Sequence, residues 1–176
     1  MPVHPRLLHP RLLGVLAAIS CLAWSGSLAA GGTWKFDTED QGHPRLAYWD
    51  NDKTIVFIGC GHAFAIHAVY PGAPKKDDDK ATITIANGKT QMTFDGIIDS
   101  RFSNLNPPNT THFVQWDLGF ARQDPELDGK RWKRLEARLF DFLDSGRPLT
   151  VSAEGQSYAL PAIKVRGWKQ RFRRIC

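Results

Sequence analysis

The chain has 176 residues, with 23 lysines and arginines against 18 aspartates and glutamates, so its formal net charge is +5. This net positive charge is well below that of a dedicated nucleic-acid-binding protein, so we expect no specific nucleic-acid binding. The histidines show no HxH or HxxxH spacing, and no phosphate-binding or dinucleotide-binding loop occurs. We therefore expect neither a metal nor a cofactor.

Residues 1–30 have the three parts of an export signal. His4–Arg11 is basic, and Leu12–Trp24 is an apolar run shorter than the roughly 20 residues that span a bilayer. Small residues follow, and cleavage is best placed after Ala29. We therefore expect a periplasmic or extracellular protein whose mature part, residues 31–176, is one β-rich domain without a transmembrane segment.

Two cysteines, Cys60 and Cys176, remain after the export signal. In an oxidising compartment such a pair usually forms one disulfide. Closing so long a loop stabilises by up to about 4.7 kcal/mol in the chain-entropy model. The alternative is a Cys60 nucleophile with His62 as its base, but no third orienting group can be identified. We therefore expect the disulfide.

The first predicted strands are the segment around Trp34 and a hairpin that turns at Asn51-Asp52. The hairpin places Asp50 opposite Lys53, and Leu46 opposite Phe57. The second strand, which contains Ile55–Ile58, is apolar on both faces. Such a strand is typical of the centre of a sheet that is covered on both sides.

The segment from His62 to Tyr70 alternates and predicts a further strand with Phe64 and Ile66 inward. It is followed by the charged, proline-containing segment Pro71–Lys80, which predicts an exposed loop. The polar segment Ser103–Thr111 predicts a second irregular loop.

Asn87-Gly88 predicts a hairpin with a two-residue turn. In that register Ile85 lies opposite Thr90, and Ile83 lies opposite Met92. One face then collects the apolar side chains and the other collects threonine and glutamine. A one-residue slip would mix the two faces, so the pattern favours this side-chain arrangement.

Two elements complete the predicted sheet. Thr111–Gly119 is predicted to form a strand, and Glu154-Gly155 predicts another hairpin with a two-residue turn. The hairpin pairs Val151 with Tyr158, and Leu149 with Leu160. Ser152 and Ser157 then share the solvent face.

Two helices are predicted from apolar residues at helical spacing. The first runs from Trp132 to Asp144, where Gly146 and Pro148 end it. The second is shorter, from Val165 to Ile175, and would bring Cys176 near Cys60. Together the elements predict an α+β fold: an antiparallel sheet of seven or eight strands in a sandwich or open barrel, with one amphipathic helix and a short C-terminal helix.

The C-terminal segment is rich in basic residues and contains no acid. Packing of its apolar stripe on the sheet would leave the basic side chains as an ordinary solvated face. The same face is also the best candidate surface for binding an acidic protein or an anionic envelope component. Its residues are Arg166, Lys169, Arg171, Arg173 and Arg174.

A catalytic constellation is not evident in the sequence. We therefore expect a small exported, disulfide-stapled binding protein rather than an enzyme. The alternative is a small secreted hydrolase that uses His62 or His112 together with an aspartate as general base and acid. The candidate aspartates are Asp95, Asp99 and Asp117.

Overall fold

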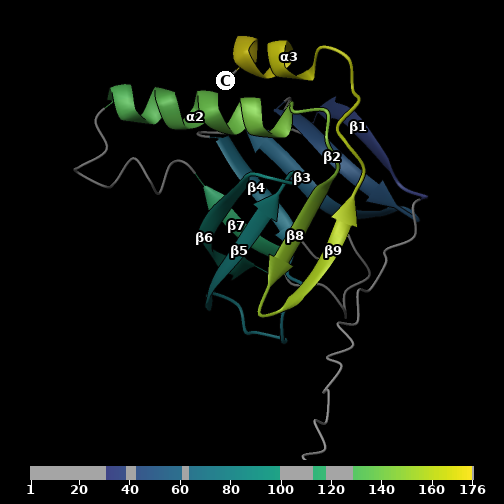
Figure 1. Ribbon diagram of the computed structural model, residues 1–176, viewed down its shortest axis with the longest axis vertical. Coiled ribbons are helices and arrows are strands. Elements are labelled where there is room, and N and C mark those ends of the chain that lie inside the picture. Colours follow the sequence, from purple (N-terminus) through teal and green to yellow (C-terminus); the bar gives the residue numbers. More distant parts are fainter. Residues whose placement is uncertain (1–30, 39–42, 61–63, 100–112, 118–128, 176) are drawn as a thin grey trace, which may run out of the picture.

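The computed structural model describes residues 31–38, 43–60, 64–99, 113–117 and 129–175 (Figure 1). The predicted export signal, the Ser103–Thr111 loop and Cys176 lie outside these ranges. Labels follow Figure 1.

The described strands form a single antiparallel sheet in the order β1-β2-β3-β4-β7-β6-β5-β8-β9. They are β1 Thr33–Thr38, β2 Pro44–Asp50, β3 Lys53–Cys60, β4 Phe64–Val69, β5 Lys80–Ala86, β6 Gln91–Asp99, β7 Phe113–Asp117, β8 Leu149–Ala153 and β9 Gln156–Leu160. The two helices are α2 Gly129–Leu143 and α3 Trp168–Ile175. The predicted α+β, antiparallel β-rich class is confirmed.

The sheet is strongly curled, so that its two edges come close together. Trp34 on β1 donates its indole N–H to the carbonyl oxygen of Pro161, directly after β9, at 2.8 Å. Tyr158 on β9 donates its hydroxyl to the carbonyl oxygen of Val69, at the end of β4, at 2.9 Å. No ladder of backbone hydrogen bonds joins β1 to β9 within the described sheet. The fold is therefore an open barrel.

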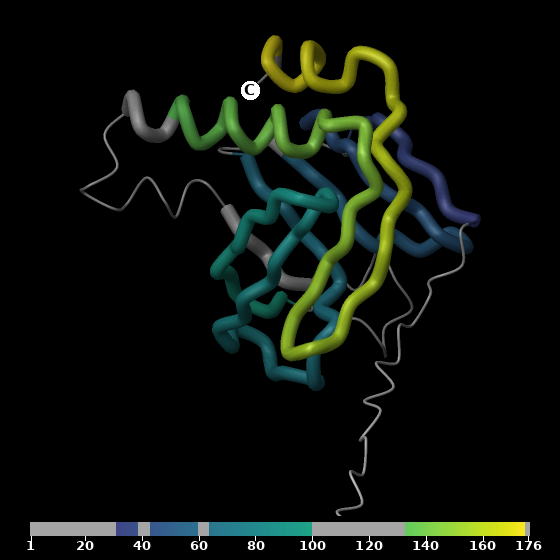
Figure 2. The backbone as a smooth tube through the Cα atoms, viewed as in Figure 1, coloured from purple at the N-terminus to yellow at the C-terminus, as the bar shows by residue number. Residues whose placement is uncertain are grey.

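The core fills the inside of the curled sheet and continues beneath the helices, which cover one end (Figures 1 and 2). Apolar side chains from most strands meet there, because alternate residues of each strand point inward. The most deeply buried include Leu46, Ile58, Ile66, Ile83, Phe94 and Val151. The helices add the buried side chains of Leu139, Phe140, Leu143, Trp168 and Phe172. Each large side chain contributes about 1.5–3 kcal/mol on burial.

The β8–β9 hairpin has the predicted register. Val151 pairs with Tyr158, and Leu149 pairs with Leu160. Glu154 and Gly155 adopt φ values of 49° and 76°. Positive φ at both central residues is the backbone of a type I′ turn.

The β5–β6 hairpin is displaced by two residues from its predicted register. Ile85 pairs with Met92 and Ile83 pairs with Phe94. The turn is formed by Gly88 and Lys89, with φ of 87° at Gly88, so glycine takes the first central position of a II′-like turn. A shift of two residues keeps each side chain on its predicted face, so the inward pattern is nevertheless correct.

The displaced turn has a tertiary cause. Asn87 is buried and donates its side-chain amide to the carbonyl oxygen of Phe142 on α2, at 3.0 Å. Its backbone N–H donates to the carbonyl oxygen of Thr90 at 3.0 Å, and its side-chain oxygen accepts the Thr90 hydroxyl. Asn87 is therefore used to join the hairpin to the helix rather than to make the turn.

The β2–β3 hairpin turns where predicted, with Asp50 opposite Lys53. The register shifts between Tyr48 and Trp49, so Leu46 faces Ile58 and the predicted pairing with Phe57 is wrong. The shift places an extra residue on β3, which is the signature of a bulge. Ile55–Ile58 is buried on both faces of the sheet, as predicted for a central strand.

The two helices occupy the predicted segments, but α3 begins at Trp168 rather than at Val165. Gly167 has a φ of 68°, which interrupts a helical path from Val165 onward. Gly146, also with φ of 68°, follows the end of α2 in the same conformation.

Candidate functional site

The helical end of the molecule carries most of its positive charge. Residues 129–176 contain twelve lysines and arginines against four acids, whereas residues 31–128 contain nine against fourteen. Among the described elements, α2 contains five lysines and arginines against two acids, and α3 contains four against none. The two helices lie together at one end of the barrel (Figure 1). Among the described residues this end is the best candidate for contact with an anionic group.

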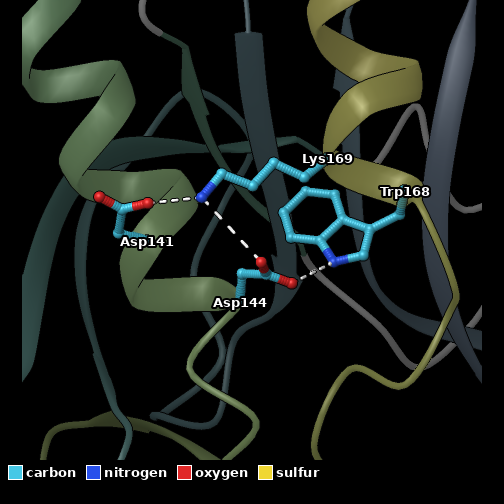
Figure 3. Close-up of polar contacts among 4 residues, drawn as sticks. All are labelled: Asp141, Asp144, Trp168 and Lys169. Atoms are coloured by element: carbon cyan, nitrogen blue, oxygen red, sulfur yellow. Dashed lines mark hydrogen bonds and ion pairs between the residues drawn. The ribbon is translucent and has the colours of Figure 1, made fainter.

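Lys169, one of the predicted contact residues, faces α2 (Figure 3). Its ammonium lies 2.5 Å from a carboxylate oxygen of Asp141 and 4.0 Å from one of Asp144. Trp168 donates its indole N–H to the other oxygen of Asp144 at 3.1 Å. The hydrogen bond from Lys169, together with its charge, lowers the pKa of Asp141 below its ordinary value. Lys169 therefore joins α3 to the C-terminal end of α2 and offsets part of the negative charge of Asp141 and Asp144.

Arg171, a second predicted contact residue, packs against β1. Its guanidinium carbon lies 4.2 Å from the ring centroid of Phe36, within cation–π range. It also donates to the carbonyl oxygen of Arg166 at 2.8 Å. Phe36 in turn meets the ring of Phe172 edge-on at 5.5 Å. Arg171 therefore helps to hold α3 on the sheet.

The remaining predicted residues, Arg166, Arg173 and Arg174, are exposed. Arg173 lies with its guanidinium carbon 5.9 Å from the ring centroid of Phe140, which places it close to α2. Two arginines of α2, Arg134 and Arg138, are also exposed. We call these five arginines the basic end.

The α2 arginines belong to the same seam as α3. Arg134 and Arg138 precede Asp141 by seven and three residues, so they share its stripe of the helix. Asp141 contacts Lys169, which fixes that stripe beside α3. Sequence reasoning missed these two residues, although the high density of Lys and Arg in α2 was a signal for them.

The candidate hydrolase residues are not brought together in the described part of the chain. Asp95 is exposed on β6 and accepts the Thr82 hydroxyl at 2.7 Å, whereas Asp99 is buried four residues further along the same strand. That spacing corresponds to about 14 Å. Asp117 ends β7, with its backbone opposite Ala65. His62 and His112 lie outside the described residues.

Asp99 does face a different histidine. His67 on β4 is buried and stacks on Phe57, with ring centroids 4.1 Å apart. Burial lowers the pKa of His67 to about 4, and the nearby charge of Asp99 partly opposes that shift. The imidazole is therefore neutral at physiological pH, and it contributes to the packing of the core through its stacking on Phe57.

Cys60 is the last residue of β3, and its predicted partner lies outside the described residues. The disulfide therefore stays a prediction. The described residues contain no group of three or more side chains placed to hold a metal ion. In the same part of the chain, none of the helices is long and apolar enough to cross a membrane.

Comparison with protein-family models, curated proteins and solved structures finds no match.

Proposed function

We propose that this chain is an exported, disulfide-stapled binding protein that holds an anionic partner through its basic end. The observation that carries the proposal is the sorting of charges over α2 and α3. Lys169 forms ion pairs with Asp141 and Asp144, whereas the arginines of the basic end are exposed. Lys169 thus offsets part of the negative charge of Asp141 and Asp144, and the five exposed arginines of the basic end give this surface its positive sign.

The chemistry of these arginines favours an acidic protein or an anionic polymer. A guanidinium presents a planar set of donors that fits carboxylate, sulfate and phosphate groups in a bidentate manner. Insertion into lipid is disfavoured, because the large apolar side chains of the helices that the structure describes are packed in the core. Leu139, Phe140, Trp168 and Phe172 are all buried in the core. Little apolar surface is left there for a membrane interface.

The disulfide part of the proposal rests on the two cysteines that remain after the export signal. Cys60 ends β3, with its backbone opposite Phe64 on β4. Phe64 contacts Phe172 of α3, with ring centroids 5.9 Å apart. An oxidised pair would hold the basic end on the barrel.

The test is binding of the full chain to polyglutamate and to dextran sulfate, as carboxylate and sulfate probes, at low and high salt. The double variant Arg173→Glu, Arg174→Glu should bind about tenfold more weakly at low salt, since it replaces two attractions by two repulsions. High salt should weaken binding of the unmodified chain.

A matched control reverses two exposed lysines outside the helical end. Lys53→Glu with Lys76→Glu changes the net charge by the same amount, and binding should stay within about threefold of the unmodified chain. An equal loss of affinity for the probes in both double variants would show that binding depends on net charge alone and not on the basic end. No loss in either would remove the basic end from the function.

The hydrolase stays the alternative, with His62 or His112 as base and Asp95, Asp99 or Asp117 as partner. Of these aspartates, Asp99 is buried near His67, and Asp95 accepts a hydrogen bond from the Thr82 hydroxyl. A turnover that His112→Ala abolishes, and that the arginine reversals leave intact, would favour this alternative.

A further inference from the structure

A groove of about 590 Å³ opens on the outer face of β5, β8 and β9. Its volume lies within the range of small-molecule sites. Its lining includes residues of the β4–β5 loop and of the β8–β9 turn. These two segments lie at the end of the barrel away from the helices (Figure 1). It is thus separate from the basic end.

The floor of the groove is a row of hydroxyl groups. Thr84 on β5 is the backbone partner of Ser152 on β8, which is the partner of Ser157 on β9. All three line the groove, and Thr82 extends the row along β5. Neighbouring strands are about 4.8 Å apart, so the row presents regularly spaced hydroxyl groups. The Thr82 hydroxyl donates to Asp95 at 2.7 Å, and the Ser152 hydroxyl donates to the carbonyl oxygen of Thr84 at 3.4 Å. The row therefore offers a ligand mainly acceptor oxygens.

The wall of the groove is held in place by Glu154, at the β8–β9 turn. One oxygen of its carboxylate accepts the backbone N–H of Ala73 at 3.0 Å, and the other lies 3.1 Å from the Lys75 ammonium. A side chain at Gly72 would meet the Tyr70 ring at 2.7 Å and the Glu154 carboxylate at 2.8 Å. The predicted exposed loop is therefore fastened to the hairpin, and the wall exists before any ligand arrives.

Two of the three charged residues of the groove lining are paired. Lys75 and Glu154 form an ion pair, and this contact raises the pKa of Lys75 and lowers that of Glu154. Lys80 adds an exposed cation to the lining. A ligand would also meet hydroxyl groups, the amide of Gln156 and the aromatic ring of Tyr70, whose centroid lies 5.7 Å from the Lys75 ammonium.

We propose that this groove binds a neutral oligosaccharide. A sugar chain offers many hydroxyls that can donate to the oxygens of the threonine and serine row, and apolar C–H groups that can contact the ring of Tyr70 beside Lys75. A strongly anionic ligand would meet the Glu154 carboxylate, and the Lys75 ammonium is already paired with that group. An apolar ligand would cover the oxygens of the row without hydrogen-bonding to them, which costs free energy. The open shape of the groove suits a chain that passes through it.

The test is a titration of the ¹⁵N-labelled full chain, followed by its amide NMR signals. The probes are maltotriose, cellotriose and tri-N-acetylchitotriose, with inorganic phosphate as the anionic comparison. At least one trisaccharide should shift the amides of residues 72–82 and 152–157, and phosphate should not. Shifts at other residues alone, no shift with any trisaccharide at tens of millimolar, or stronger binding of phosphate in the groove would overturn the proposal.

A nearly isosteric double variant tests the hydroxyl row itself. Thr84→Val with Ser152→Ala removes two hydroxyls with little change in shape and should weaken binding about five- to thirtyfold. The control is Thr150→Val, which removes an exposed hydroxyl two residues from Ser152 on the same face but outside the groove. Its affinity should equal that of the unmodified chain. Unchanged affinity in the double variant, with its amide spectrum still folded, would rule the row out as the site.

Discussion

His67 shows how burial can turn a titratable residue into a structural one. It is 5 % exposed, stacked on Phe57, and its pKa is lowered to about 4 mainly because burial disfavours the charged imidazolium. The charge of Asp99 acts in the opposite direction but does not cancel the effect of burial. Protonation of His67 is therefore coupled to unfolding.

The sign of that coupling gives a pH dependence. The folded-state pKa of about 4 lies below the ordinary value of 6.5, so the unfolded chain takes up the proton first. The free energy of unfolding should be insensitive to His67 above pH 6.5 and should fall as the pH drops from 6.5 toward 4, by about 3 kcal/mol in total. Urea unfolding at pH 7.5 and 4.5 measures the fall.

The variant His67→Gln should lose most of this fall, because it has no proton to take up. His43→Gln serves as its control and should keep the pH dependence of the unmodified chain. If His67→Gln and the unmodified chain lose stability in parallel between pH 6.5 and 4, the buried imidazole is not the cause.

Asn87 is the second residue whose role depends on tertiary structure. Its amide donates to the carbonyl oxygen of Phe142, and both groups are buried. Asn87→Ala should lower the free energy of unfolding by about 1–3 kcal/mol, since the Phe142 carbonyl is left without that donor. Lys89→Ala, in the exposed part of the same turn, should change it by less than about 0.5 kcal/mol. Denaturant titration compares the two, and equal effects would contradict the assigned role.

At the scale of elements, α3 is attached by two kinds of contact of unequal strength. Its ion pairs to Asp141 and Asp144 lie at the surface, where such pairs contribute 0–1 kcal/mol at the median. Its ring at Phe172 is fully buried between Phe64, Phe140 and Trp168. Removing a buried phenylalanine ring costs about 3–5 kcal/mol.

We therefore expect Lys169→Met to lower the free energy of unfolding by less than about 1 kcal/mol, and Phe172→Ala to lower it by about 3–5 kcal/mol. Urea unfolding monitored by tryptophan fluorescence compares both variants with the unmodified chain. A larger loss for Lys169→Met than for Phe172→Ala would mean that electrostatics, not packing, holds the helix.

The elements also show which local signals were sufficient to predict strand pairing. Glu154-Gly155 predicted the correct register because both turn residues adopt positive φ, and the contacts of the Glu154 side chain with Ala73 and Lys75 leave that turn in place. Asn87-Gly88 has an equally strong local pattern, but the helix 55 residues away binds the asparagine side chain. The bulge on β3, opposite Tyr48 and Trp49, changed the pairing of β2 and β3 without moving their turn.

The candidate sites were less predictable than the fold, for the same reason. The sequence shows that the C-terminal segment is basic, but only packing on α2 and β1 separates Lys169 and Arg171 from the exposed arginines. The groove could not be foreseen at all. It depends on which strands neighbour β8 and on where the β4–β5 loop is fastened, and both are long-range facts.

At the scale of the whole molecule, the two proposed surfaces lie at opposite ends of the barrel. The basic end is formed by α2 and α3, and the groove is formed by β5, β8, β9 and the loop before β5 (Figure 1). The arrangement leaves both accessible at once, so one partner need not displace the other. Their tests are independent, because no residue is shared between the basic end and the groove lining.

The position of β7 in the sheet has a consequence for the order in which the molecule folds. β1 to β4 form a meander of neighbours in sequence, and β5 pairs with β6 as a hairpin, so both blocks need only local contacts. Within the described sheet β4 and β6 are joined only through β7, which follows β6 in the chain but is separated from β4 by β5 and β6. Until those five residues insert, each block carries an open edge with unpaired backbone groups. Joining the two blocks therefore requires the non-local pairing of β7 with β4, the kind of step that slows folding and leaves a nascent chain open to pairing with its neighbours.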